Sequence, residues 1–323
     1  MKIEDIGGEF RLIERIKKSV NAYSKDVIAG IGDDAAVLKS NKKNYMLLKI
    51  DALVENCHSS LKYSKPEQIG MKAIEQNVSD IAAMGGFPKY AVVSLALPDS
   101  IDVEFIDGLY KGINKRAGEY GINIVGGNIT HSLGIAINVA LIGFVEKEFL
   151  KLRSGAKIGD LIFCSGDVGK SAAGLELLRR GFAASSIKKH LEPRCRLDLA
   201  RKLARISINS MIDVSDGVAP EVAHICEQSG TGAVIYADKI PISKDTIASA
   251  KKAGKSALDF ALYGGEDFEL VFTADKNKLS QFKKYGVSVI GEIVGKKQGI
   301  GLVKDNKKID LESGFEHFKR FGI

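Results

Sequence analysis

The spacing of apolar residues predicts a series of helices and strands in the first half of the chain. Apolar side chains three or four residues apart predict helices over residues 10–20, 66–85 and 103–121. Uninterrupted or alternating apolar stretches predict strands over residues 44–51, 89–98, 122–130 and 134–146. Their connections are of hairpin and crossover type, which indicates an α+β domain rather than a strict alternation of parallel strands and helices.

A polar, basic stretch over residues 146–160 follows, and we place the domain boundary there. Beyond it, the pattern predicts strands over residues 161–166 and 232–238, and helices over residues 171–182, 197–206 and 219–230. We therefore expect two domains, an α+β domain over residues 1–146 and an α/β domain over residues 147–323.

The composition is that of a globular protein. With 323 residues, 45% of them hydrophobic and 27% charged, the chain is long enough for two packed domains. The first ten residues carry acids and no apolar core, and no apolar run is long enough for a membrane span, so we expect neither a secretory signal nor a membrane partner. The four cysteines form no C-x-x-C pair, which argues against zinc and indicates reduced thiols in the cytoplasm.

The net charge of +7 suits an anionic ligand. Lys and Arg are spread along the chain, however, and there is no tryptophan and no stretch in which aromatic and basic residues alternate. Nucleic-acid-binding surfaces usually combine clustered basic residues with a recognisable motif. We therefore expect a phosphate-bearing small molecule rather than a nucleic acid.

One stretch, CSGDVGKSAAG over residues 164–174, looks like a phosphate-binding P-loop, G-x-x-x-x-G-K-[ST]. Gly169, Lys170 and Ser171 supply the end of that pattern. Its first glycine would fall at Cys164, and Gly166 is two residues too close. The residues alone leave open whether a nucleotide binds here or elsewhere.

A second signal is a set of short turns in which acids accompany glycine or small residues at the ends of apolar segments. The acids in these turns are Asp33, Asp34, Asp51, Asp80, Asp213, Asp216, Glu266 and Asp267. Carboxylates in apolar surroundings are costly unless something compensates them. Mg²⁺ held by carboxylates and substrate phosphates is one natural compensation, so the pattern indicates an acidic, metal-dependent phosphate site.

Each of these residues also has an ordinary structural interpretation. Asp216 alone is more typical of a helix N-cap, and the Asp33–Asp34 pair alone is more typical of a turn. A single histidine such as His58 is more often structural than functional. The recurrence of such turns within one chain is what favours a site.

Six motifs, in this order, resemble those of thiamine-monophosphate kinase, in the superfamily of aminoimidazole-ribonucleotide synthetase and selenophosphate synthetase. They are GIGDDAAVL, NVSDIAAMGG, IVGGNIT, RSGAKIGD, IDVSDG and YGGEDFELVFT. The resemblance extends over nearly the whole chain. It implies an N-terminal α+β domain that dimerises with a second subunit and a C-terminal α/β domain. It also implies that the nucleotide lies on acidic turns, so that residues 164–174 are a strand-to-helix turn, with Lys170 capping it or facing solvent.

Site residues carry over from the family's motifs position by position. The magnesium ligands implied are Asp34, Asp51, Asp80, Asp213 and Asp216, of which Asp34, Asp213 and Asp216 are the residues expected at the reaction centre. The ATP contacts implied are Tyr110, Gly127, Asn128, Arg153 and Ser215. The contacts implied for thiamine monophosphate are His58, Glu266 and Phe315. Magnesium ions and an arginine suit phosphoryl transfer, which needs positioning and charge neutralisation more than covalent chemistry.

The chain departs from the family's pattern in two places. Asn128 stands where the family has aspartate, and Lys49 and Ile50 stand where it usually has hydroxyl residues, all around one metal position. Our hypothesis is that the ammonium group of Lys49 partly replaces the missing metal charge. Ser59 stands where the family has phenylalanine, so the acceptor pocket is expected to differ in shape.

Three interpretations follow. The first is a homodimeric kinase that converts thiamine monophosphate and ATP to thiamine diphosphate by direct in-line transfer. The second is a related enzyme that acts on another small acceptor. The third is a catalytically weakened protein that binds a nucleotide or a thiamine phosphate. The number of acids around the expected phosphate favours an enzyme.

Overall fold

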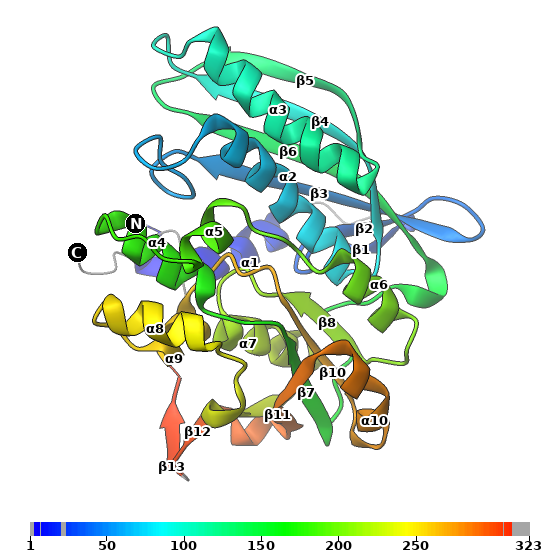
Figure 1. The fold of residues 1–323 in the computed structure, drawn as a ribbon. Helices are drawn as coiled ribbons and strands as arrows, with labels where there is room; N and C mark the ends of the chain where they lie inside the picture. The colour runs from blue at the N-terminus through cyan, green and yellow to red at the C-terminus, as the bar shows by residue number, and fades with distance from the viewer. Residues whose placement is uncertain (1–2, 7, 21–23, 306, 312–323) are drawn as a thin grey trace.

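The computed structural model describes residues 3–6, 8–20, 24–305 and 307–311, which form two mixed sheets with helices packed against them (Figure 1). The first sheet has the strand order β1-β2-β3-β6-β4-β5. In that order its strands are β1 (Val27–Ala29), β2 (Ala36–Lys39), β3 (Asn44–Val54), β6 (Ala136–Glu146), β4 (Phe87–Leu97) and β5 (Asn123–His131). Neighbouring strands are antiparallel except for β4 and β5, which are parallel. The α+β prediction for this half is confirmed.

The second sheet has the strand order β13-β12-β9-β11-β7-β10-β8. In that order its strands are β13 (Lys307–Asp310), β12 (Ile300–Lys304), β9 (Gly232–Tyr236), β11 (Val287–Val294), β7 (Asp160–Ser165), β10 (Leu270–Asp275) and β8 (Ser210–Asp213). Within this second sheet, only β9 and β12 are paired in parallel among the described strands. The expected second domain of helices and strands is present, although antiparallel pairs dominate its sheet as well as the first.

Ten α-helices lie among the described residues. The first half contains α1 (Glu9–Ser19), α2 (Pro66–Ala83) and α3 (Val103–Tyr120). The second contains α4 (Lys170–Arg179), α5 (Ser186–Leu191), α6 (Leu197–Ala204), α7 (Val218–Ser229), α8 (Lys244–Lys252), α9 (Ala257–Tyr263) and α10 (Leu279–Phe282). In Figure 1, α2 and α3 lie across one face of the first sheet, and α2 also runs down toward the second half.

Helix α2 connects the two halves. It begins at Pro66, whose ring suits the first helical position, and its end is marked by Gly85 in the left-handed region (φ 73°). Every residue from Ile69 to Ala83 is buried. One side of the helix packs on α3, β3 and β6, and the other side packs on α5, α6 and β8 of the second half. A helix that is buried on all sides must satisfy its polar side chains inside the protein.

Glycines allow α2 and α3 to pack closely. A Cβ atom on Gly70 would overlap the carbonyl oxygen of Leu109, and one on Gly112 would overlap the carbonyl oxygen of Glu67. The two backbones are therefore closer than any larger side chain permits, and this contact fixes the position of α2 on the first sheet.

Among the described residues, no helix packs on the opposite face of the first sheet. On strand β3, Leu47 and Leu53 are buried toward the helices, whereas Leu48, Ile50 and Val54 are exposed. Ile50 and Val92 both pair with Ala140, the first across β3 and the second across β4, so they lie on one face. This outer face, defined by Leu48, Ile50, Val54, Tyr90 and Val92, is an exposed apolar patch.

The glycine contact gives a testable consequence for stability. We expect Gly112→Ala to destabilise the protein by about 1–3 kcal/mol, because the added methyl group must push α3 away from α2. Gly118→Ala is the matched control on the same helix, where nothing lies within 4 Å of an added Cβ. That variant should gain roughly 0.5–1 kcal/mol from its higher helix propensity. Equal effects in chemical denaturation would contradict the close packing.

Candidate functional site

Three predicted metal ligands meet where the two halves join. Asp34 lies between β1 and β2, Asp80 lies on α2, and Asp213 ends β8. All three are buried, and each has a carboxylate oxygen within 4.8 Å of such an oxygen of the other two. Residues distant in sequence thus form one acidic cluster, to which both halves contribute.

The protein compensates this cluster only in part. Arg153 donates from Nε (3.0 Å) and Nη2 (2.5 Å) to Oδ1 of Asp34, and Ser79 donates to Oδ2 of Asp213. Oδ2 of Asp34 is buried and has no hydrogen-bond partner in the structure. Burial, and after it the charge of Asp34, raises the pKa of Asp213 to about 7, and burial raises the pKa of Asp80 well above its usual range. An additional cation nearby would favour the ionised form of such a group.

The turn before β2 also contacts the backbone of Arg153, through Asp33, the residue before Asp34. The backbone N–H of Arg153 donates to both carboxylate oxygens of Asp33, at 3.4 and 3.2 Å. Burial, and after it the charge of Asp34, raises the pKa of Asp33 to about 7. Asp33 and Asp34 therefore tie the loop before β2 to the connection between the two sheets.

Among the described residues, Lys49 is the lysine that forms an ion pair with the acidic cluster. Its Nζ lies 3.1 Å from Oδ2 of Asp80 and 3.5 Å from Oδ1 of Asp51. Burial opposes the charged form, yet Asp80 and Asp51 outweigh it and raise the pKa of Lys49 above its usual value. Asp51 is therefore linked to the acidic cluster by the ammonium group of Lys49, which pairs with both Asp51 and Asp80.

The turn after β8 is held by a residue that the sequence analysis missed. Glu221, in the first turn of α7, is buried and accepts from the backbone N–H groups of Ser215 (3.2 Å) and Asp216 (2.9 Å). Burial, and after it the charges of Asp216 and Asp213, raises the pKa of Glu221 well above its usual range. An acid five residues after the acidic turn, on the helix that follows it, was the available signal.

Glu266 lies in a second polar group at the same junction. Its Oε1 is 2.6 Å from Nζ of Lys72 on α2, and its Oε2 is 3.2 Å from Nδ1 of His190. Although burial raises the pKa of Glu266, Lys72 and His190 outweigh it and lower this pKa to about 2. Lys72 Nζ also donates to the carbonyl oxygen of His58 at 2.7 Å. The structure therefore links two predicted acceptor residues, His58 and Glu266, through a buried lysine.

Neither Lys72 nor His190 was identified from the sequence. A lysine within a helix whose neighbours are nearly all apolar was the signal for Lys72, because such a charge needs a buried partner. Nothing in the local pattern marks His190, which belongs to a short helix of the second half.

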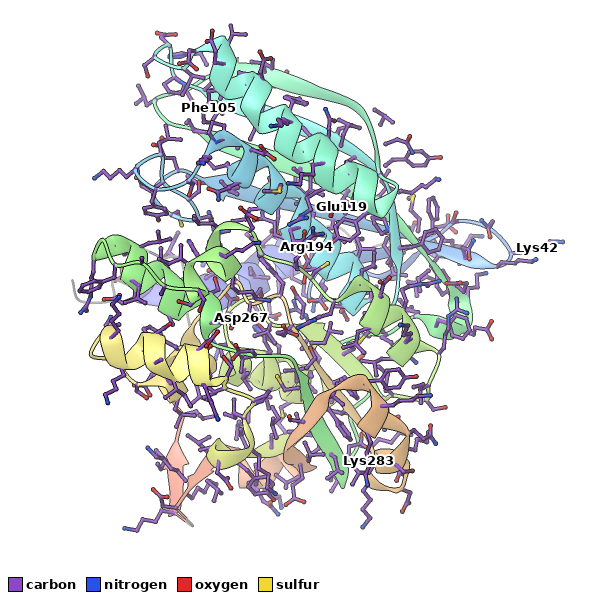
Figure 2. The ribbon with its side chains drawn as sticks, in the orientation of Figure 1. Lys42, Phe105, Glu119, Arg194, Asp267 and Lys283 are labelled. Atoms are coloured by element: carbon purple, nitrogen blue, oxygen red, sulfur yellow. The ribbon has the colours of Figure 1, made fainter. Side chains whose placement is uncertain are left out.

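The P-loop-like stretch is occupied by a side chain of the protein itself. Asp267, labelled in Figure 2, accepts from the backbone N–H groups of Gly169 (2.5 Å) and Ser171 (2.9 Å) at the start of α4. Lys170 pairs with Asp167 (3.4 Å) and Asp245 (3.8 Å). The helix N-terminus that a phosphate would require is thus filled by a carboxylate, in agreement with a strand-to-helix turn.

Other predicted residues lie apart from the acidic cluster. Gly127, on β5, pairs with Val93 of β4, and β5 is three positions from the Asp51 strand β3 in the sheet order. Asn128 alternates with Gly127 and lies on the outer face, roughly 14 Å from β3 at about 4.8 Å per strand. Tyr110 is half-buried against the first core. Phe315 lies outside the described residues. The roles of these residues remain predictions.

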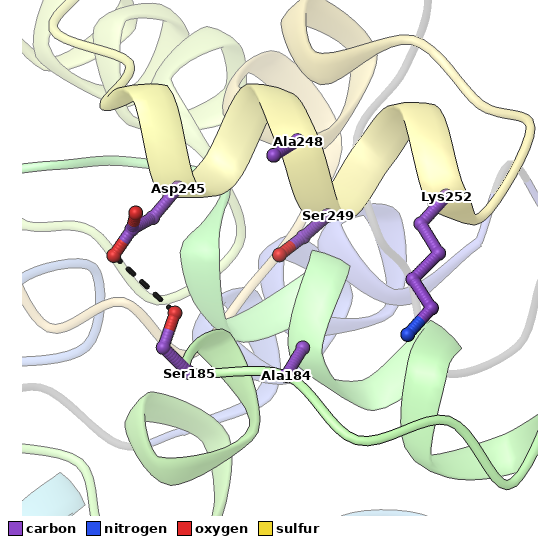
Figure 3. Close-up of a pocket in the computed structure, with 6 residues that line it drawn as sticks. All are labelled: Ala184, Ser185, Asp245, Ala248, Ser249 and Lys252. Atoms are coloured by element: carbon purple, nitrogen blue, oxygen red, sulfur yellow. Dashed lines mark hydrogen bonds between the residues drawn. The ribbon is translucent and has the colours of Figure 1, made fainter.

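Two hollows are formed by other residues. One of about 670 Å³ is bordered by Glu119 and Arg194, both labelled in Figure 2 and in contact with each other. Another of about 200 Å³ lies between α8 and the segment before α5, where Ser185 donates to Asp245 at 3.3 Å (Figure 3). None of the predicted site residues lines either hollow.

The two domains share an acidic cluster, with an arginine beside it, at their junction. Comparison with known families shows to which class of protein this arrangement belongs. Models of the AIR synthase related protein family match the chain twice, the N-terminal domain over residues 32–145 and the C-terminal domain over residues 157–304. The chain belongs to this family.

Its relatives within the family are more specific. The chain is 36% identical to the thiamine-monophosphate kinase of Aquifex aeolicus (strain VF5), over 98% of this chain and 100% of that protein. It is 35% identical to the thiamine-monophosphate kinase of Bacillus subtilis (strain 168), over 96% and 99%. A solved structure described as AaThiL complexed with AMPPCP and TMP superposes with a TM-score of 0.87 at 35% identity, covering 98% of this chain and 99% of that one. Among the described residues, no helix is long and apolar enough to cross a bilayer.

The ionised state of Glu266 predicts a pH dependence of stability. Because its folded pKa of about 2 is below the ordinary 4.5, its ionisation contributes up to about 3 kcal/mol above pH 4.5, which is lost as the pH falls toward 2. We expect Glu266→Gln to lower the melting temperature most at pH 7, with the difference from wild type shrinking between pH 4.5 and 2. Glu104→Gln, at an exposed carboxylate, is the control. A pH-independent difference would contradict the assignment.

Proposed function

We propose that this protein transfers the terminal phosphoryl group of ATP to thiamine monophosphate, which gives thiamine diphosphate. The observation that carries this proposal is the convergence of Asp34, Asp80 and Asp213 from both halves into one buried cluster. Relatives named thiamine-monophosphate kinase match the chain over nearly its full length, and a solved structure with AMPPCP and TMP has the same fold. The kinase is an enzyme of the phosphotransferase class.

Magnesium fits the acidic cluster on chemical grounds. Three carboxylates within 4.8 Å, one of them with a buried oxygen that has no partner, form the oxygen-rich site that Mg²⁺ prefers. We assign Asp34, Asp80 and Asp213 to hold it, with Asp216 on the adjacent turn as a further predicted ligand. When bound, Mg²⁺ would neutralise charge on the phosphates.

The chain's own residues then position the two substrates. Arg153, held by Asp33 and Asp34, supplies a fixed guanidinium beside the cluster, suited to a phosphate. Ser215 lies on the turn that Glu221 fixes, and Tyr110, Gly127 and Asn128 are the other proposed nucleotide contacts. We propose His58, Glu266 and Phe315 for the acceptor. Transfer is proposed to be direct, because the site supplies charge and position rather than a nucleophile.

Glu266 acts differently from a free carboxylate in this proposal. Its charge is already matched by Lys72. We therefore expect Glu266 to help position the acceptor. Its attraction to a cationic ring is weakened by the positive charge of Lys72 beside it.

We further propose a homodimer joined through the outer face of the first sheet. This face presents Leu48, Ile50, Val54, Tyr90 and Val92, which no other element covers among the described residues. A flat apolar sheet face suits a second copy of itself in an isologous contact. The domain boundary is proposed at residues 146–147, and the four free cysteines support a reducing, cytoplasmic setting.

The kinase proposal is tested with purified protein, ATP, Mg²⁺ and thiamine monophosphate, with thiamine diphosphate as the measured product. We expect Asp34→Asn and Asp213→Asn each to lower kcat by roughly 100-fold or more, because each removes a charge that holds the cation. Asp26→Asn is the matched control, since the carboxylate of Asp26 forms an ion pair with Lys39 at the surface. Binding of thiamine monophosphate without product would instead support a non-catalytic binding protein.

The dimer proposal predicts a change of mass. Val92→Glu places a charge on the outer face and should convert a dimer to a monomer in light scattering. Val103→Glu, at an exposed position at the start of α3, should leave the mass unchanged. A wild-type protein that is monomeric at micromolar concentration would refute the proposal.

A further inference from the structure

The acidic cluster has two sides, and one of them already contains a cation. Lys49 and Asp51 are two residues apart on β3, so their side chains share the face that packs toward α2. Nζ of Lys49 lies 3.5 Å from Oδ1 of Asp51 and 3.1 Å from Oδ2 of Asp80. The lysine side chain is only 20% exposed. Its ammonium group thus lies between two carboxylates, in the place a bridging cation would take.

On the other side the cation is the guanidinium group of Arg153, which contacts Oδ1 of Asp34 and does not bridge two carboxylates of the cluster. Asp34 offers one oxygen to Arg153 and keeps its second oxygen buried without a partner. Asp213 and Asp80 lie within 4.8 Å of it. The Asp34 side therefore has room in its charge balance for a divalent cation, whereas beside Asp51 the ammonium group of Lys49 already compensates the carboxylate.

We propose that the ammonium group of Lys49 takes the place of a divalent cation between Asp51 and Asp80, so that Asp51 is not a metal ligand in this protein. Metal binding is then confined to the side of Asp34, Asp80 and Asp213. This inference rests on the proposed function, because it concerns the metals that accompany the nucleotide.

Two physical reasons support the assignment. A divalent ion at Asp51 would lie only a few ångströms from the ammonium group in a buried site, where like charges repel strongly. The two other positions that depart from the family's pattern also supply no ligand beside Asp51. Ile50 is apolar and points to the outer face, and Asn128 lies on that same outer face. A lysine, a compact point charge on a flexible stem, can instead serve both carboxylates and a phosphate oxygen.

The test counts bound metal rather than product. Mn²⁺ is titrated into the full-length protein with AMPPCP, and free Mn²⁺ is followed by electron paramagnetic resonance. We expect Asp51→Asn to bind as many Mn²⁺ ions per chain as wild type. We expect Lys49→Ser, which frees both carboxylates, to bind one additional Mn²⁺ ion. Lys39→Ser, which removes a surface lysine paired with Asp26, is the matched control and should bind the wild-type number.

Two results would overturn the inference. The loss of one Mn²⁺ ion from Asp51→Asn would make Asp51 a metal ligand beside the lysine. A Lys49→Ser protein that melts like wild type but gains no Mn²⁺ would show that the lysine displaces nothing. If Lys49→Ser does not fold, the Asp51→Asn count decides alone. Failure of the wild-type protein to phosphorylate thiamine monophosphate would contradict the proposed function. The number of bound Mn²⁺ ions would still decide whether Asp51 is a metal ligand, because that measurement does not depend on turnover.

Discussion

The structure depends on one helix that has no exposed face. From Ile69 to Ala83, α2 is buried between the first sheet and the second half, so its charged side chains must find partners within the protein. Lys72 pairs with Glu266, and Asp80 pairs with Lys49. Leaving either charge without a partner would be strongly destabilising, because a buried charge loses its hydration. These requirements fix the second half against the first and place the two ends of the site on one rigid element.

The site is built from carboxylates in three different electrostatic states. Glu266 stays ionised because Lys72 and His190 hold it. Asp267 fills the helix N-terminus at Gly169 and Ser171, where its position prevents an external phosphate from binding. Asp213 belongs to the cluster that Arg153 and Lys49 compensate only in part, and burial raises its pKa to about 7. The same residue type therefore serves as an ion-pair partner, as a helix cap and as a proposed metal ligand, according to which cations and N–H groups surround it.

Local patterns predicted individual elements better than their pairing. The helices at residues 66–85 and 103–121 are present as α2 and α3, because their apolar spacing and their terminal glycines are local signals. The small strands β1 and β2 were not identified, since three or four residues carry too little periodicity. The order of the second sheet could not be read from the chain either. Strand β7 lies between β10 and β11, more than a hundred residues away, and that pairing depends on long-range register.

The sequence by itself determined the residue types of the site. The acidic turns, the apolar helix and the motifs are each formed by residues that are neighbours along the chain, so they can be recognised without the structure. It indicated Asp34, Asp80 and Asp213, and it flagged Lys49 as unusual. Only the tertiary structure decided which of these acids share a pocket and which charge meets which partner. The roles of Lys72 and His190 became visible only there, since their common partner Glu266 is distant in sequence. Compensation of a buried charge is a property of three-dimensional proximity, and spacing along a chain does not encode it.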